Sequence, residues 1–178
     1  MKLSNYLIGI FLVLSSAYSF AADTSAVKSP NGLQLKEATL KVVGQAEMRW
    51  LMFPLYRVTL KTADGVYQKG RYPQKLDILY LRNIDKQDLL TATDGEWKRL
   101  GISVTKRKEW IRQLGNIWPS IKRGDKLAFQ VNPHGQNYFT YNGKKLGGIA
   151  DKQFGQSFLA IWLSPKTSRP AIRQRLIG

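Results

Sequence analysis

The chain of 178 residues contains no cysteine. This absence excludes disulfide bonds, a thiol nucleophile and every cysteine-ligated metal site. A chain of this length can bury a sizeable core without cross-links, and 43% of its residues are hydrophobic. We therefore expect one globular domain that is held together by packing alone.

Histidine is almost as scarce, since the sequence holds only His134. One histidine cannot form the usual zinc site or a di-histidine iron site. It lies in the stretch "NPHGQN", whose proline and glycine are typical of an exposed turn. The chain also lacks the G-x-S-x-G motif of serine hydrolases. The sequence therefore predicts no catalytic and no metal-binding residue.

Acidic residues are few, because 12 Asp and Glu stand against 28 Lys and Arg, which gives a formal net charge of +16. Their scatter does not nominate a carboxylate pair of the glycosidase type. A positive field of this size attracts anions, among them anionic membrane or envelope surfaces and acidic ligands. A basic, solvated surface without a dedicated partner is the alternative.

Residues 1–21 have the pattern of a secretory signal peptide, with an early lysine, an apolar run over residues 6–14 and small residues at the end. The run is short for a membrane span, so a retained anchor is the alternative. We expect export to the periplasm, where no nucleic-acid partner is expected. Residues 22–38 are polar and predict a flexible segment, which leaves residues 39–178 as the folded domain.

The rest of the chain alternates between two hydrophobic periods. A period of two predicts strands within residues 38–50, 54–65, 75–82, 126–131 and 137–142. A helical period predicts two helices after Asp85 and near Thr105, a third capped by Asp151, and a short fourth beginning at Pro170. Strands and helices are segregated along the chain, which indicates an α+β domain with helices on one face of an antiparallel sheet.

Two details of this pattern are specific enough to test. The stretch "KLDILYLR" carries Leu76, Ile78 and Tyr80 on one face and Leu79 and Leu81 on the other, so it predicts a strand buried on both sides. Asp64-Gly65 and Asn142-Gly143 are dipeptides that favour tight turns.

The glycine-rich stretch "NGKKLGG", which precedes an apolar helical run, raises the question of a phosphate-binding loop. A Walker loop needs Gly-Lys-Ser/Thr at its end, but Ile149 and Ala150 follow Gly148. The dinucleotide fingerprint G-x-G-x-x-G is also missing. The stretch therefore predicts a hairpin turn that leads into a core helix, and no cofactor is expected.

Several longer stretches resemble the bacterial, exported branch of the chalcone isomerase-like family. The resemblance covers about Val42 to the C-terminus, and its order and spacing are more specific than any one motif. It is carried by "GQAEMRWLMFPLYRVTLK", "LDILYLRNIDKQDLLTATDGEWKRLG", "IKRGDKLAFQVNPHGQNYFTYNGKKLGGIADKQFGQSFLAIWLSPKT" and "RQRLIG". The resemblance implies an antiparallel sheet under a layer of helices, with a ligand cleft between the two.

Plant isomerases of this family cyclise chalcones without a cofactor, and their catalytic positions can be carried over to this chain. The arginine position falls at Arg49, and the strand threonine falls at or near Tyr56. The tyrosine, asparagine and late hydroxyl positions fall near Ile84, near Thr91 and at Ile161. Most of the polar groups are absent, so the resemblance favours a protein that is not an enzyme. A cofactor-independent intramolecular lyase or isomerase stays open as an alternative.

Other relatives in the family bind fatty acids, with the arginine and a tyrosine holding the carboxylate. The resemblance therefore implies Arg49 and Tyr56 as ligand-binding residues for a fatty acid or a similar apolar acid. A guanidinium at the mouth of an apolar cleft suits a carboxylate, and apolar residues flank Arg49 on both sides. The alternative is that Arg49 lies on the surface and Tyr56 is an ordinary strand aromatic.

Overall fold

The computed structural model describes residues 39–178. The predicted signal peptide and the predicted flexible segment, which together span residues 1–38, lie outside the described residues.

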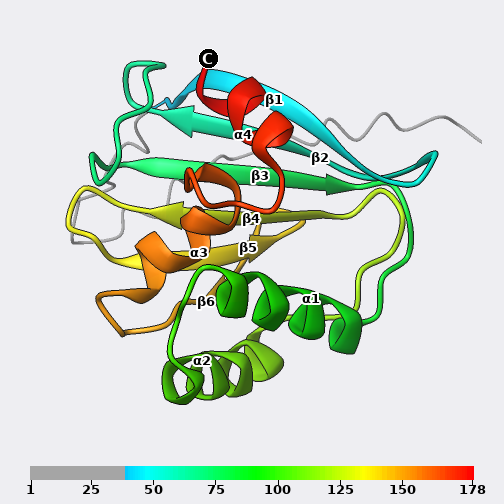
Figure 1. Cartoon of the computed structure of the whole chain (residues 1–178). Coiled ribbons are helices and arrows are strands. Elements are labelled where there is room, and N and C mark those ends of the chain that lie inside the picture. Colours follow the sequence, from blue (N-terminus) through cyan, green and yellow to red (C-terminus); the bar gives the residue numbers. More distant parts are fainter. Residues whose placement is uncertain (1–38) are drawn as a thin grey trace, which may run out of the picture. The chain divides into compact units, whose positions relative to one another are not determined.

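The described residues form a six-stranded antiparallel sheet and four helices (Figure 1). The strands follow one another in chain order across the sheet, and the helices cover one of its faces, so the predicted α+β class is confirmed. The strands are β1 (Lys41–Trp50), β2 (Phe53–Thr62), β3 (Gln74–Tyr80), β4 (Lys126–Val131), β5 (Asn137–Tyr141) and β6 (Lys144–Gly147). The helices are α1 (Lys86–Arg99), α2 (Val104–Ile117), α3 (Phe154–Leu163) and α4 (Pro170–Ile177).

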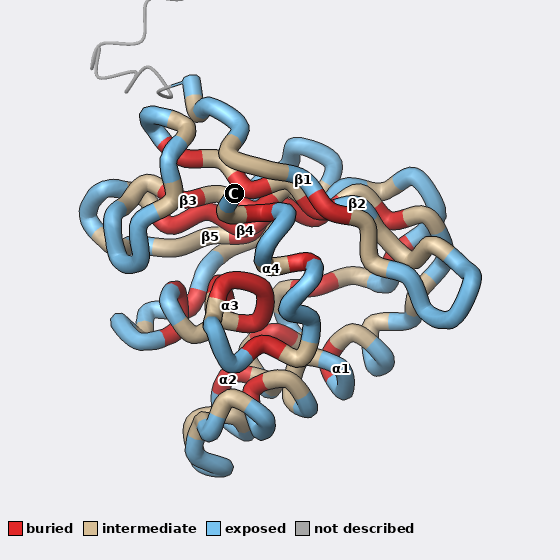
Figure 2. The backbone as a smooth tube through the Cα atoms, turned by 45° about the horizontal axis from the view of Figure 1, so that its top comes forward, coloured by how far each residue is buried: buried red, intermediate tan, exposed pale blue. Residues whose placement is uncertain are grey.

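The core lies between the sheet and the helices, because each element places its apolar residues on that side. Val58 and Leu60 of β2 are fully buried, as the period of two predicts. The helix α3 is buried along most of its length (Figure 2). Aromatic rings fill the centre of this layer. The ring centroids of Phe129 and Phe158 lie 4.5 Å apart, and this contact joins β4 to α3.

The prediction that β3 is buried on both faces is wrong. Its burial alternates strictly, and Leu79 on the second face is only half-buried. On the same face Asp77 forms ion pairs with Lys61 at 2.7 Å and Lys75 at 3.5 Å. The second face of the sheet carries charges, and none of the helices within residues 39–178 covers it, so the apolar residues there do not mark a second core.

Helix ends follow local sequence in two cases and depart from it in one. Asp85 is the residue ahead of α1, although its side chain makes no capping bond, and Gly101 ends the helix with a φ of +80°. Asp151 was expected to cap α3, but Gln153 occupies that position. The carboxylate of Asp151 instead accepts a hydrogen bond from the Gln153 N–H at 2.8 Å and one from Trp110 Nε1 at 3.1 Å. It thereby joins the entry of α3 to α2.

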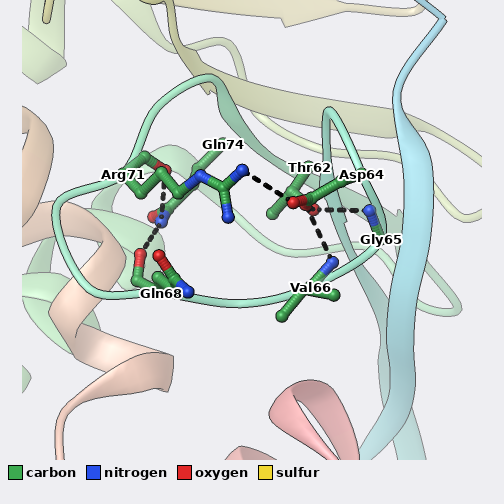
Figure 3. A network of polar contacts seen from close by, with 7 residues as sticks. All are labelled: Thr62, Asp64, Gly65, Val66, Gln68, Arg71 and Gln74. Carbon is green, nitrogen blue, oxygen red and sulfur yellow. Dashed lines mark hydrogen bonds and ion pairs between the residues drawn. The ribbon is translucent and has the colours of Figure 1, made fainter.

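One of the two predicted tight turns is present as predicted, whereas Asp64-Gly65 lies in a bend of the longer loop between β2 and β3. Asn142 and Gly143 connect β5 to β6 with φ values of +48° and +83°. In the loop between β2 and β3, Asp64 forms an ion pair with Arg71 at 2.8 Å (Figure 3). The side chain of Gln74 donates to the backbone carbonyl of Arg71 at 2.9 Å, so this loop is closed by its own polar contacts.

The C-terminal helix α4 packs against β1, which is the edge strand of the sheet. Gly44 permits this contact, because a Cβ atom there would lie 2.3 Å from the carbonyl oxygen of Arg175. Ile172 and Leu176 of α4 are buried. The first strand and the last helix are therefore direct neighbours (Figure 1).

Candidate functional site

A cavity of about 460 Å³ lies between the helix-covered face of the sheet and the helices. Its wall is largely apolar and combines residues from β1 to β4, α1, α3 and the segment ahead of α4. Apolar side chains such as Met48, Leu55, Ile78, Leu89 and Phe158 form most of the lining. An apolar cavity with a few convergent polar groups is the usual form of a small-molecule site.

Tyr56 of β2 is the first of these polar groups. Its hydroxyl accepts a hydrogen bond of 3.0 Å from the indole Nε1 of Trp162 on α3. Removal from water raises the pKa of Tyr56, an effect that this hydrogen bond and the positive charge of Arg169 partly oppose. At neutral pH the hydroxyl is therefore protonated. Among the described residues no acceptor is recorded for its proton, which is free to bond a ligand oxygen.

Tyr80 of β3 lies beside Tyr56 on the cavity wall. The two rings meet edge to face, with centroids 5.9 Å apart. Burial raises the pKa of Tyr80 well above its ordinary value, and the neighbouring Tyr56 adds to the rise. The cavity is thus lined by two tyrosines that stay neutral at physiological pH.

A second polar cluster lies where α1 meets the segment ahead of α4. The hydroxyl of Ser168 donates to Glu96 Oε1 at 2.7 Å, and the other carboxylate oxygen of Glu96 is buried without a partner among the described residues. Arg169 follows Ser168, is exposed, and lines the same cavity. No ion pair is recorded for Arg169 within the described part of the chain, so its guanidinium is the cation available at this cavity.

The two residues predicted to bind the ligand take different places. Tyr56 lines the cavity, whereas Arg49 does not. The side chain of Arg49 is 61% exposed and its Nε donates to Glu47 Oε1 at 2.8 Å. Because neighbouring residues of a strand point to opposite faces, Met48 faces the cavity and Arg49 turns away from it. The structure therefore does not bring Arg49 and Tyr56 together at one site.

Of the other positions carried over from the isomerases, two lie in the cavity and one lies outside it. Ile84 and Ile161 both line the cavity, so two positions expected to hold hydroxyl groups in the enzymes hold aliphatic side chains here. Thr91 is exposed on α1 and lies outside the cavity.

Sequence reasoning missed Glu96, Ser168 and Arg169. Glu96 and Ser168 are 72 residues apart, and neither belongs to a motif whose spacing suggests a site. The sequence contains one weak indication of Glu96. This residue precedes the buried Trp97 in "EWKRLG" and so lies at the border of the apolar face of α1.

Within residues 39–178 no group of three or more His, Asp and Glu side chains could hold a metal ion. His134 is exposed in the turn between β4 and β5, where the sequence places it. In this same range no helix is long and apolar enough to cross a membrane.

On the opposite face of the sheet lies a larger, shallow hollow of about 680 Å³, which we call the outer groove. Its lining is rich in charged side chains, among them Arg57, Lys61, Lys75, Lys126 and Arg175. Glu47 and Asp77 are the acidic residues of the lining, so the outer groove is net positive. Its lining is more polar than that of the inner cavity.

The fold and the cavity together define an α+β protein with a largely apolar cavity between sheet and helices. Residues 21–178 match the family model described as chalcone isomerase-like, and the chain belongs to this family. An uncharacterized protein of Haemophilus influenzae is 26% identical over 136 residues, which are 76% of this chain and 67% of that protein.

Among solved structures, the chain is similar to a fatty-acid binding protein of Arabidopsis thaliana. The TM-score is 0.61 at 9% sequence identity, and the match covers 78% of this chain and 86% of that one. At this identity the likeness establishes a shared fold.

Proposed function

We propose that this protein binds a fatty acid or a similar apolar acid in the inner cavity and does not convert it. The observation that carries the proposal is the combination of an apolar wall with a free tyrosine proton and an unpaired guanidinium. Tyr56 supplies a neutral donor and Arg169 supplies the charge. The acyl chain of the ligand would lie among the apolar residues of β1 to β4 and α3.

The volume of the cavity fits this proposal. Ligand sites for small molecules measure roughly 300 to 1,000 Å³, and the cavity of about 460 Å³ falls in this range. The fold shared with a fatty-acid binding protein supports the same class of ligand. In this proposal the carboxylate lies at the exposed end of the cavity, because Arg169 is itself exposed.

Binding without conversion is supported by the aliphatic side chains of Ile84 and Ile161, which leave the cavity without the hydroxyl groups of the plant enzymes. The alternative of a cofactor-independent lyase or isomerase would need other residues. Glu96, one of the two carboxylates that line the cavity, is a candidate because it also accepts a hydrogen bond from Ser168. Turnover of a chalcone or another enone that is abolished by Glu96→Gln would favour this alternative.

The test of the main proposal is direct. The protein is stripped of lipid and titrated with a long-chain fatty acid by calorimetry, and the untreated protein is examined by native mass spectrometry. We expect saturable binding of one acid and a co-purified mass that delipidation removes. Absence of both results would refute the proposal.

A second candidate function is binding to an anionic envelope surface, and the outer groove favours it. Lys126 and Arg175 lie in this groove without a recorded ion pair among the described residues. Binding of this kind weakens steeply with salt. It fits the proposal, supported by the signal-like residues 1–21, that the protein is exported to the periplasm. Cell fractionation tests the location, and Lys126→Glu tests the role of the groove.

A further inference from the structure

The turn between β1 and β2 exposes four consecutive apolar residues, 50–53, which we call the apolar tip. Trp50, Leu51, Met52 and Phe53 are exposed by 62%, 78%, 83% and 52%. The other large apolar side chains that are exposed within residues 39–178 are three valines, Val42, Val66 and Val104. Single exposed apolar residues are ordinary, whereas a contiguous group marks an interaction site. The tip lies at the end of a long hairpin and is drawn as exposed in Figure 2.

The backbone of the tip is as unusual as its side chains. Leu51 is the first of the two turn residues and has a φ of +55°. This left-handed conformation favours glycine or asparagine, and two-residue hairpin turns commonly place glycine there. An exposed leucine in this position is not explained by the fold, because a glycine or an asparagine would make the same turn with less strain.

Arginines lie directly behind the tip. The guanidinium carbon of Arg82 lies 4.5 Å from the centre of the Phe53 ring. Arg49 precedes the tip on β1 and is exposed. Arg82 forms no recorded ion pair with another described residue, so its charge is available to an anion. The apolar tip is thus followed by two arginines: Arg49, which is paired with Glu47, and Arg82, which follows β3 and supplies the positive charge that is available to an anion.

This order of chemical groups matches the interface of a lipid bilayer. Aromatic residues favour the headgroup level, aliphatic side chains enter the acyl region, and arginines bind lipid phosphates. A stable protein interface needs about 800 Å² from each partner, and a narrow convex turn of four residues offers a poor surface of that kind. We infer that the apolar tip inserts into the surface of an anionic phospholipid bilayer.

The apolar tip adjoins the inner cavity. Trp50 belongs to the tip and also lines the inner cavity, as does Met48 two residues before it. The cavity therefore reaches the base of the tip. If the cavity holds an apolar acid as proposed above, the docked tip lets that acid pass between bilayer and cavity without crossing water. The docking itself does not depend on the ligand.

Tryptophan fluorescence gives a specific test, because the tip holds Trp50 and the other tryptophans, at positions 97, 110, 118 and 162, are at most 8% exposed. Residues 1–38 contain no tryptophan, so quenching by lipid does not report on the N-terminal residues. The full chain is mixed with vesicles of phosphatidylglycerol and brominated phosphatidylcholine. We expect quenching in the wild type and its loss in Trp50→Phe.

The matched variants separate insertion from other effects. Leu51→Asn with Met52→Asn should reduce quenching at least about fivefold, because burial in lipid scales with apolar area. Neither residue lines the cavity, so fatty-acid binding in solution should not change. Val66→Asn, which removes an exposed apolar side chain elsewhere, should leave quenching intact. Lys126→Glu in the outer groove should also leave it intact.

Three results would overturn the inference. The first is a wild type whose fluorescence does not respond to the brominated vesicles. The second is equal quenching in the wild type and in Trp50→Phe. The third is a dimer of the wild type in gel filtration that the double variant abolishes while vesicles have no effect, since a second copy would then cover the tip.

Discussion

The indole nitrogen of Trp162 and the hydroxyl of Tyr56 are joined by a hydrogen bond of 3.0 Å, although the two residues are 106 positions apart. The bond connects α3 to β2 across the cavity. It uses the acceptor side of the hydroxyl and leaves the donor side to a ligand. One contact thus supports the fold and orients the group that we propose to bind the acid.

Removal of this hydrogen bond should lower stability. Tyr56→Phe leaves the indole N–H of the buried Trp162 without an acceptor, so we expect a loss of about 1 to 3 kcal/mol in the free energy of unfolding. In the Tyr56→Phe protein the hydrogen bond is already lost, so adding Trp162→Phe should not lower the free energy of unfolding through that bond a second time. The double-mutant cycle should therefore show a coupling energy of about 1 kcal/mol. Urea denaturation measures both. Tyr72→Phe is the control, because the hydroxyl of that half-buried tyrosine has no recorded hydrogen bond to another residue in the range 39–178. Additive single losses would contradict this account.

Arginine substitutions should distinguish the two candidate partners of the carboxylate. Arg169→Gln removes the guanidinium on the cavity wall, and we expect fatty-acid affinity to fall by about 1.5 to 3 kcal/mol, which is typical of a hydrogen bond to a charged group. Arg49→Gln removes a guanidinium that is paired with Glu47 outside the cavity, and its effect should be small. Calorimetric titration of both variants with a fatty acid shows which arginine binds the carboxylate. The opposite ranking would support Arg49, whose role in binding stays a prediction.

Glu96→Gln should strengthen the binding of a fatty acid. The substitution removes a negative charge that lines the same cavity as the proposed carboxylate, and an amide can still accept the hydrogen bond from Ser168. We expect affinity to rise by several-fold at neutral pH. A ligand that donates a hydrogen bond to Glu96, such as an apolar alcohol, should instead bind more weakly. Asp85→Asn, which removes a negative charge outside the lining, is the control and should leave the affinity unchanged.

Asp151 should make the fold sensitive to acid. The backbone N–H of Gln153, and then the side chains of Lys106 and Trp110, hold the pKa of its carboxyl below the ordinary value. A lowered folded pKa means that the stabilisation is complete above the unfolded value of about 3.9 and is lost as the pH falls through the folded value. The difference in melting temperature between wild type and Asp151→Asn should therefore be largest near pH 6 and should shrink below pH 4.

Asp85→Asn provides the control for the loss of one negative charge, because its side chain makes no capping hydrogen bond. A difference in melting temperature that is constant from pH 2 to pH 7 would show that the contacts of Asp151 do not depend on its charge.

Much of the fold was predictable because it follows from local patterns. The alternation of β2 and the turn at Asn142-Gly143 depend on neighbours within a few residues, and both were predicted correctly. The second face of β3 was not, because the partners of Asp77 come from β2 and from a residue two positions away on β3 itself. A run of leucines does not reveal that charged neighbours share their face.

The site was less accessible to sequence reasoning than the fold. Tyr56 could be nominated through the family resemblance, and it lines the cavity. The same resemblance nominated Arg49, but the phase of β1 turns that side chain to the other face. Arg169 enters the site only because the segment between α3 and α4 lies against α1, where Ser168 donates to Glu96. A position of this kind is set by tertiary packing and has no signature in residue spacing.

The packing of α4 on β1 also sets the order in which the domain can be completed. Strand β1 is among the first parts of the described domain to be synthesised, and α4, which packs on it through the close approach at Gly44, is the last. A growing chain therefore leaves the surface of β1 that α4 covers exposed until the residues of α4 are available. Exposed apolar surface promotes association between chains, so a chain without α4 should aggregate even though its sheet and its cavity-lining strands are complete.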